Sequence, residues 1–124
     1  MNIVTLISAA QIFNQFRQVQ ISSRLAYKIM KFCKSVSIEE EFYNDKRNDI
    51  INEYALRDKN GQIIVSDEGM IRIVEDQINE ANKALAELND IEVEVPNIKF
   101  TLAELEELKL SVEDMFILDA FIEE

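Results

Sequence analysis

The fold is decided by residues 24–57, which read RLAYKIMKFCKSVSIEEEFYNDKRNDIINEYALR. When each residue advances about 100° around a helix, one broad arc collects the apolar side chains Leu25, Ala26, Ile29, Met30, Phe32, Cys33 and Val36. The opposite arc collects Arg24, Tyr27, Lys28, Lys31 and Lys34. The stretch therefore predicts a long amphipathic helix, in which a kink near Ser35–Ser37 is left open.

The sign of the charge changes inside this helix. Residues 1–38 contain five basic residues and no acidic one, a formal charge of +5. The rest of the chain holds eight basic and 24 acidic residues, a formal charge of −16, so that the whole chain carries −11. We expect this polarity to bear on how the protein meets a partner.

Length and composition favour one small helical domain. A chain of 124 residues predicts a single domain, 1–124. Two Gly and one Pro provide few turns, which favours long helices over a β fold with many turns. The fold class expected is α+β, mostly α: a long helical hairpin with a small two- or three-stranded sheet and a short C-terminal helical pair.

The missing residue types exclude several chemistries. The chain has no His, which removes histidine acid–base catalysis, Ser–His nucleophiles and His metal ligands. The single Cys33 cannot form a disulfide within the chain and indicates a reducing, cytoplasmic compartment. Two isolated Gly residues leave no phosphate-binding loop. We expect no enzyme, no cofactor and no metal site, and the apolar start of the chain fits neither a signal peptide nor a membrane span.

Before the long helix, two elements are expected. Met1–Leu6 has the β-branched character of a short strand, and apolar spacing predicts a first helix over about Ile7–Val19. Ser22 or Ser23 is then the expected N-cap of the long helix.

The middle of the chain predicts the second arm of a helical hairpin. Asp58–Gly61 has the composition of a turn, and Gln62–Val65 that of a short strand. A helix from Glu68 to about Asn89, capped by Ser66 or Asp67, would pack antiparallel to Glu39–Arg57. Its apolar residues repeat at spacings of three and four, which is typical of a heptad seam and offers a surface for a homodimer: Ile71, Val74, Ile78, Ala81, Leu85 and Leu88.

The last third of the chain predicts a strand and two short helices. Ile91–Val95 alternates apolar and acidic residues and could pair with Gln62–Val65, with Met1–Thr5, or with both. Thr101 and Ser111 begin capping-box patterns, which predict helices at Leu102–Leu108 and Val112–Glu123.

A calcium-binding loop is a tempting interpretation of the turn. With Gly61 at the sixth loop position, Asp58, Asn60 and Asp67 would stand at the third, fifth and twelfth. The first position would be Leu56, which has no oxygen ligand in its side chain, and the twelfth lacks the longer Glu. A plain Asn-Gly turn explains the same residues, and a carboxylate metal site remains only a weak third hypothesis.

Two charged surfaces are candidate contact sites for a partner protein. The basic one comprises Arg24, Lys28 and Lys31, and the acidic one Glu39, Glu40 and Glu41. Direct binding to nucleic acid or to an anionic membrane is not expected, because the chain as a whole is strongly negative. Spaced carboxylates can instead occupy the nucleic-acid groove of a host protein by imitating phosphates, although simple solubility charge explains the same composition.

Three segments together resemble a family of small, uncharacterised phage and prophage proteins. They are DKNGQIIV at 58–65, EVEVPNIK at 92–99, and LKLSVEDMF at 108–116 with the closing FIEE. The resemblance implies a phage-encoded protein that acts inside a bacterial host cell, and it supplies no active-site residues.

Two functions follow as hypotheses. The first is a non-enzymatic acidic protein that binds a host protein and could inhibit a defence or nucleic-acid-handling factor. The second is a phage structural or assembly accessory that acts as a homo-oligomer through the seam residues Ile71, Val74, Ile78 and Leu85.

Overall fold

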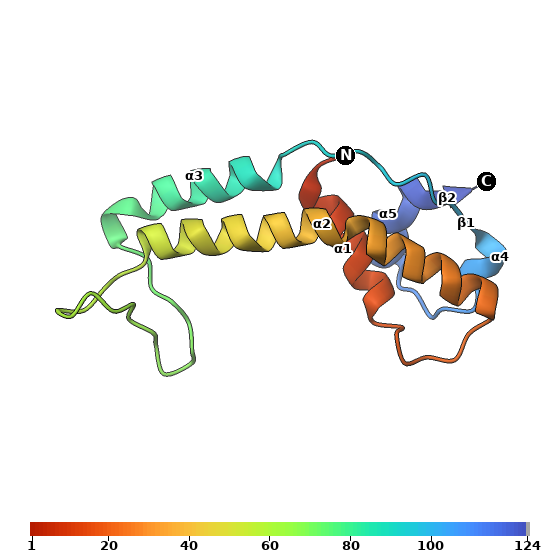
Figure 1. Cartoon of the computed structure of the whole chain (residues 1–124), viewed down its shortest axis with the longest axis horizontal. Coiled ribbons are helices and arrows are strands. Elements are labelled where there is room, and N and C mark those ends of the chain that lie inside the picture. Colours follow the sequence, from red (N-terminus) through yellow and green to blue (C-terminus); the bar gives the residue numbers. More distant parts are fainter. Residues whose placement is uncertain (124) are drawn as a thin grey trace. The chain divides into compact units, whose positions relative to one another are not determined.

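The computed structural model describes residues 1–123 and shows an α+β fold that is mostly α (Figure 1). The chain divides into two compact units. Unit 1 is Met1–Glu40 with Glu92–Glu124, and unit 2 is Glu41–Ile91. The elements are α1 (Ile3–Asn14), α2 (Ser23–Tyr54), the 3₁₀ turn η1 (Glu75–Gln77), α3 (Ile78–Asn89), β1 (Phe100–Thr101), α4 (Leu102–Leu105), α5 (Val112–Leu118), the 3₁₀ turn η2 (Asp119–Phe121) and β2 (Ile122–Glu123).

The first helix begins earlier than expected. The strand predicted at Met1–Leu6 is wrong, because α1 already begins at Ile3. Asn2 is the N-cap, and its Oδ1 accepts hydrogen bonds from the backbone N–H of Thr5 at 3.0 Å and from the Thr5 hydroxyl at 2.6 Å. A good side-chain cap therefore outweighs the weak β preference of the residues that follow it.

The long helix is confirmed as α2. The backbone N–H of Leu25 donates to the Ser22 hydroxyl oxygen at 3.3 Å, so Ser22 caps the helix as expected. Helical structure continues through Ser35 and Ser37, whose hydroxyls donate to the carbonyls of Phe32 and Lys34 at 2.7 Å. The side-chain hydroxyls thus bond within the helix without ending it.

The core of unit 1 is built around four phenylalanines. Phe13 of α1 lies 5.2 Å from Phe32 of α2 and 4.7 Å from Phe100 of β1, measured between ring centroids. Phe121 lies 4.8 Å from Phe32, with the rings nearly perpendicular. All four side chains are buried. Edge-to-face and tilted packing of this kind adds to the stabilisation from apolar burial.

The sheet of unit 1 differs from the expected one. It consists of β1 and β2, which pair in parallel with Phe100 opposite Ile122. The strand expected at Ile91–Val95 is reduced to one antiparallel bridge between Glu92 and Asn2, supported by a hydrogen bond from the Val93 N–H to the Met1 carbonyl at 3.0 Å. Both capping boxes form, but α4 and α5 are shorter than predicted, and the end of the expected last helix becomes η2 and β2.

The turn predicted at Asp58–Gly61 is confirmed in unit 2. Asp58 Oδ1 accepts from the N–H groups of Asn60 and Gln62 at 2.8 and 3.0 Å. Gly61 has a φ of +78°, which a residue with a side chain rarely adopts. The strand expected at Gln62–Val65 is present only as isolated bridges at Ile63 and Val65.

The second arm of the hairpin is half as long as expected. The helix predicted over Glu68–Asn89 is α3, which begins at Ile78. Ser66 caps no helix and instead closes a tight turn, in which the N–H of Gly69 donates to its carbonyl at 2.8 Å and Gly69 has a φ of +81°. Ile71 and Ile73 form antiparallel bridges with Val65 and Ala55, so the backbone is extended where the helix was expected.

Within unit 2, α3 runs antiparallel to the second half of α2. The Tyr43 hydroxyl donates to Asn89 Oδ1 at 2.7 Å near one end of the pair, and the Val74 N–H donates to the Tyr54 carbonyl at 2.9 Å near the other. Figure 1 shows the same pairing. The helical hairpin is therefore confirmed, although few of its side chains are buried: Ala55, Ala81 and Leu88 are the buried apolar residues described in this unit.

Candidate functional site

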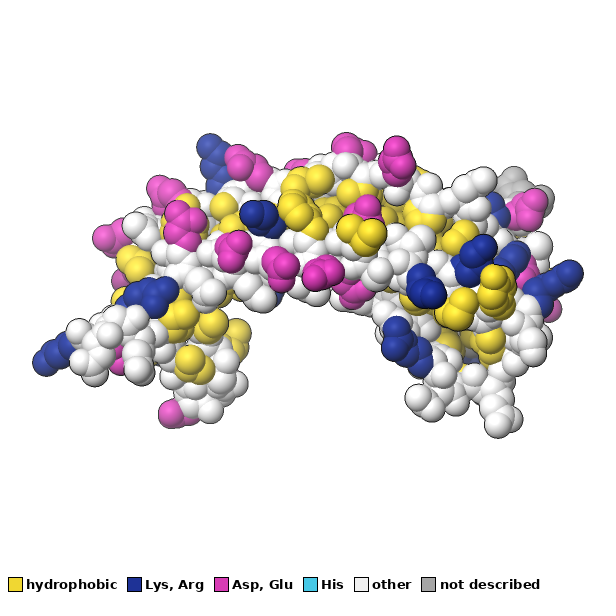
Figure 2. Space-filling view, in the orientation of Figure 1, with side chains coloured by type: hydrophobic (Ala, Val, Ile, Leu, Met, Phe, Trp, Pro, Cys, Tyr) yellow, Lys and Arg dark blue, Asp and Glu magenta, His cyan; other side chains and the backbone are white. Residues whose placement is uncertain are grey.

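A row of carboxylates follows the part of α2 that belongs to unit 2. It consists of Glu41, Asp45, Asp49 and Glu53, each four residues from the next and all exposed; we call it the carboxylate ladder. Side chains four residues apart are neighbours on a helix surface. Figure 2 shows Asp and Glu side chains gathered in a row over this part of the helix.

The ladder lies on the face of α2 that points away from the helical pair. With Glu41 at zero, the ladder spans about 0° to 120° around the helix axis. The half-buried Tyr43, Ile50 and Tyr54 fall at about 180° to 220° by the same count. Packing within unit 2 therefore leaves the ladder open to solvent.

The ladder is electrostatically unfavourable for the isolated helix. Like charges four residues apart destabilise a helix by roughly 0.2–0.5 kcal/mol per pair. Among the described residues the ion pairs are Met1–Glu92 and Lys28–Glu104, and both lie in unit 1. Unit 2 holds twelve acidic and six basic residues, a formal charge of −6. Its negative charge is therefore directed into solvent rather than neutralised by ion pairs.

A second surface, of opposite sign, lies in unit 1. It is a shallow hollow of about 640 Å³ on the first half of α2, which we call the basic hollow. Figure 2 shows Lys and Arg side chains gathered over this half of the helix. The hollow is lined by Arg24, Tyr27, Lys28, Lys31, Asn97, Ile98 and Lys99.

Lys28 holds the two sides of the basic hollow together. Its Nζ donates to the carbonyl of Lys99 and to Glu104 Oε1, both at 2.8 Å. The hydrogen bond from Lys28 is the main cause that lowers the pKa of Glu104, aided by hydrogen bonds from Thr101 and opposed by burial. Only 14% of the Glu104 side chain is exposed, and its Oε2 is buried without a hydrogen-bond partner. Lys28 therefore has a structural role in addition to its place in the lining.

An apolar groove of about 600 Å³ lies between the end of α1 and α2, also in unit 1. Its lining includes the apolar side chains of Phe16, Ile29 and Met30 and the thiol of Cys33. Burial raises the pKa of the Cys33 thiol, and nearby Glu40 adds to this effect while Arg17 opposes it. The thiol is thus held in its protonated, poorly nucleophilic form.

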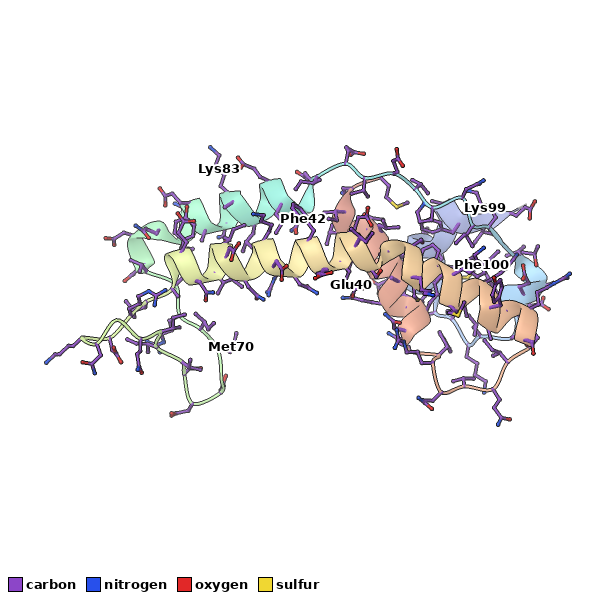
Figure 3. The ribbon with its side chains drawn as sticks, viewed as in Figure 1. Glu40, Phe42, Met70, Lys83, Lys99 and Phe100 are labelled. Atoms are coloured by element: carbon purple, nitrogen blue, oxygen red, sulfur yellow. The ribbon has the colours of Figure 1, made fainter. Side chains whose placement is uncertain are left out.

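The acidic residues chosen from the sequence do not share one surface. Glu39 and Glu40 are half-buried in unit 1, where Glu40 lines the apolar groove (Figure 3). Glu41 is exposed and is the first member of the carboxylate ladder in unit 2. The basic residues Arg24, Lys28 and Lys31 do come together, in the basic hollow.

The residues expected to form an oligomer seam are divided between two kinds of structure. Ile71 and Val74 precede α3, Ile71 in an antiparallel bridge with Val65, whereas Ile78, Ala81, Leu85 and Leu88 lie on the helix. The continuous heptad seam predicted from the spacing is therefore wrong. Ile71 and Ile78 remain 40% and 43% exposed, so apolar surface is still present in this part of unit 2.

Sequence reasoning missed three ladder members and Lys99. The spacing of Asp45, Asp49 and Glu53 from Glu41 was available as a pattern of acids at every fourth residue. Lys99 is far from Lys28 in the sequence, and no pattern along the chain indicates that the two meet.

Within residues 1–123, no group of three or more Cys, Asp or Glu side chains is arranged to hold a metal ion. Among the helices described there, none combines the length and the apolar character needed to cross a bilayer. Comparisons of the chain with known protein families, with curated proteins and with solved structures found no match.

Proposed function

We propose that this protein is a non-enzymatic acidic protein that binds a basic surface of another protein through the carboxylate ladder. The observation that carries the proposal is the ladder itself: four exposed carboxylates on one face of a helix, outside the ion pairs described for the chain. Such an arrangement weakens the helix and adds nothing to packing. A partner with a complementary positive surface would neutralise the repulsion between the carboxylates, and the attraction between the two surfaces would make association fast and specific.

The expected partner is a protein whose basic surface normally meets nucleic acid. Successive ladder carboxylates rise about 6 Å along the helix axis. They present regularly spaced negative charge as a nucleic-acid strand does, at lower density than the roughly 3.4 Å per phosphate of DNA. Occupying such a surface would inhibit a defence or nucleic-acid-handling factor.

The resemblance to phage proteins gives the proposal its cellular setting. A phage-encoded protein acts in the cytoplasm of a bacterial cell, so the partner would be a host protein. The sequence segments that carry this resemblance, such as residues 58–65, lie outside the ladder and assign no role to it.

A second candidate function is that of an assembly accessory acting as a homo-oligomer. It is favoured by apolar side chains of unit 2 that remain exposed: Val65, Met70, Ile71 and Ile78. Light scattering after size-exclusion chromatography tests it. A dimer that persists in high salt would support it, because apolar contacts are not screened, and a monomer at all accessible concentrations would contradict it.

The experiment that tests the first proposal is affinity capture of the tagged protein from bacterial lysate. Capture at low and high salt, each with and without added duplex DNA, is followed by mass spectrometry. We expect one dominant nucleic-acid-binding protein that is lost at high salt and displaced by DNA. A partner retained in high salt and indifferent to DNA would contradict the proposal.

A matched pair of variants locates the contact. The ladder variant is Glu41→Gln, Asp45→Asn, Asp49→Asn and Glu53→Gln. Its control neutralises four other exposed acids of unit 2, Asp67, Glu68, Glu80 and Glu87, and so has the same net charge. Loss of the partner in the ladder variant alone supports a contact at the ladder, whereas equal loss in both variants would indicate a general effect of net charge.

A further inference from the structure

The basic hollow is a positive surface within a negative unit. Unit 1 holds seven basic and twelve acidic residues by sequence, a formal charge of −5. Four of its seven basic side chains nevertheless line one hollow: Arg24, Lys28, Lys31 and Lys99. Their concentration requires an explanation other than solubility, for which acidic charge already suffices.

Two of these four cations have internal partners. Lys28 donates to Glu104 and to the Lys99 carbonyl, and Lys99 Nζ donates to the Ala120 carbonyl at 2.6 Å. Arg24 and Lys31 make no hydrogen bond or ion pair among the described residues, and both are exposed. Lys31 Nζ lies 5.6 Å from the centroid of the Tyr27 ring, which keeps this cation at the hollow. Two cations are therefore available to an anionic ligand.

The other wall of the hollow is a segment outside regular secondary structure, with a bend at Asn97. Among the described residues, no backbone–backbone hydrogen bond involves residues 94–98, although Phe100 directly afterwards pairs in the sheet. Asn97, Ile98 and Lys99 of this wall line the hollow. Figure 3 labels Lys99 and Phe100, the residues with which this segment leads into β1. Pro96 has no N–H, so the unpaired backbone groups open to a peptide bound in the hollow are those of Asn97 and Ile98.

We propose that the basic hollow binds an extended acidic segment of a partner protein. Its carboxylates would contact Arg24 and Lys31, and its backbone would form hydrogen bonds with the unpaired backbone groups of Asn97 and Ile98. A short acidic peptide fits better than a nucleic acid, because a long polyanion would extend beyond the four cations onto the acidic remainder of unit 1. The site is independent of the carboxylate ladder, which lies on unit 2 and has the opposite charge.

Fluorescence anisotropy of the full chain with a labelled peptide of alternating Glu and Val tests this site. We expect saturable binding that weakens with salt, and no binding of the matching Gln–Val peptide. Binding should fall at least tenfold in Arg24→Glu/Lys31→Glu. The control Lys46→Glu/Arg47→Glu makes the same change of charge at exposed residues of α2 in unit 2, and it should bind as the unchanged protein does.

Two further measurements decide between this site and other interpretations. Hydrogen exchange at Asn97 and Ile98 should slow when the Glu–Val peptide binds, because new backbone hydrogen bonds form. Unchanged exchange there, or equal loss of binding in both charge variants, would overturn the proposal. Tighter binding of a single-stranded oligonucleotide of the same charge would also overturn it, because the hollow would then be a nucleic-acid site.

Discussion

Phe32 and Phe116 show how far the environment of a side chain decides its contribution to stability. Phe32 is fully buried and contacts Phe13, Phe100 and Phe121, whereas 78% of Phe116 is exposed. Both lie on helices, and both are apolar residues in helical patterns. Only the structure distinguishes the centre of the core from its surface.

Phe32→Ala should therefore destabilise the protein strongly. Removing a buried phenylalanine costs about 3–5 kcal/mol through lost burial and the cavity left behind. Phe116→Ala is the matched control and should change the free energy of unfolding by less than about 0.5 kcal/mol. Urea denaturation of both variants tests this prediction. Similar losses in the two variants would contradict the assignment of the core.

The Lys28–Glu104 ion pair makes stability depend on pH. The pKa of Glu104 is lower in the folded protein than in the unfolded chain, chiefly because of the hydrogen bond from Lys28. Its contribution is therefore fully present above the ordinary Glu pKa of about 4.3 and is lost as the pH falls through the lower folded-state value.

Glu104→Gln should remove the contribution of this ion pair to the pH dependence of stability. At neutral pH we expect a loss of about 1.5–3 kcal/mol, the usual contribution of a hydrogen bond to a charged group. The difference from the unchanged protein should shrink as the pH falls below about 4.3. Chemical denaturation as a function of pH measures both effects, with the exposed Glu106→Gln as control. A difference that stays constant down to acidic pH would rule out this role for Glu104.

Among the helices, strands and turns, those that depend on neighbouring residues were predicted correctly, whereas those that depend on pairing between separate segments were not. The long helix, both capping boxes and the turn at Asp58 follow from residue types within a few positions. The start of α3 was predicted too early because the helical spacing of apolar residues continues back to Ile71. In the structure Ile71 instead forms an antiparallel bridge with Val65. The parallel pairing of β1 with β2 joins distant residues and leaves no pattern in either segment.

The candidate surfaces, too, were predictable where they depend on residues of one helix and not where they depend on tertiary structure. The basic side chains of α2 were found from helical periodicity, whereas the wall of the hollow formed by Asn97–Lys99 depends on tertiary structure. The carboxylate ladder was available from spacing alone, but its exposure depends on which face of α2 packs in unit 2.

Neutralising the carboxylate ladder should stabilise the helix that carries it. The variant replaces three like-charge pairs at four-residue spacing by neutral side chains of similar helix propensity, so we expect a gain of about 1 kcal/mol. The gain should be largest at low salt, where repulsion is least screened. Thermal unfolding followed by circular dichroism at two salt concentrations measures it. A loss of stability would mean that the acids make stabilising contacts in the free protein.

At the scale of the molecule, the two units differ in how much apolar surface they bury. Unit 2 contributes Ala55, Ala81 and Leu88 to the buried apolar residues, whereas the phenylalanine core and most other buried side chains belong to unit 1. Stability depends mainly on such burial. Unit 2 should therefore open more easily than unit 1.

Native-state hydrogen exchange followed by mass spectrometry tests this difference. Peptides from residues 45–91 should exchange faster than peptides from α1 and from the first half of α2. Equal protection throughout the chain would show instead that both units unfold in one cooperative step.

We propose the carboxylate ladder as the surface that binds a partner protein. The most direct measurement is the affinity of the captured partner, purified, for the unchanged protein, the ladder variant and its charge-matched control. We expect tight binding to the unchanged protein and to the control, a steep loss of affinity with salt, and binding weakened at least tenfold in the ladder variant. Equal affinity of the partner for all three proteins would contradict it.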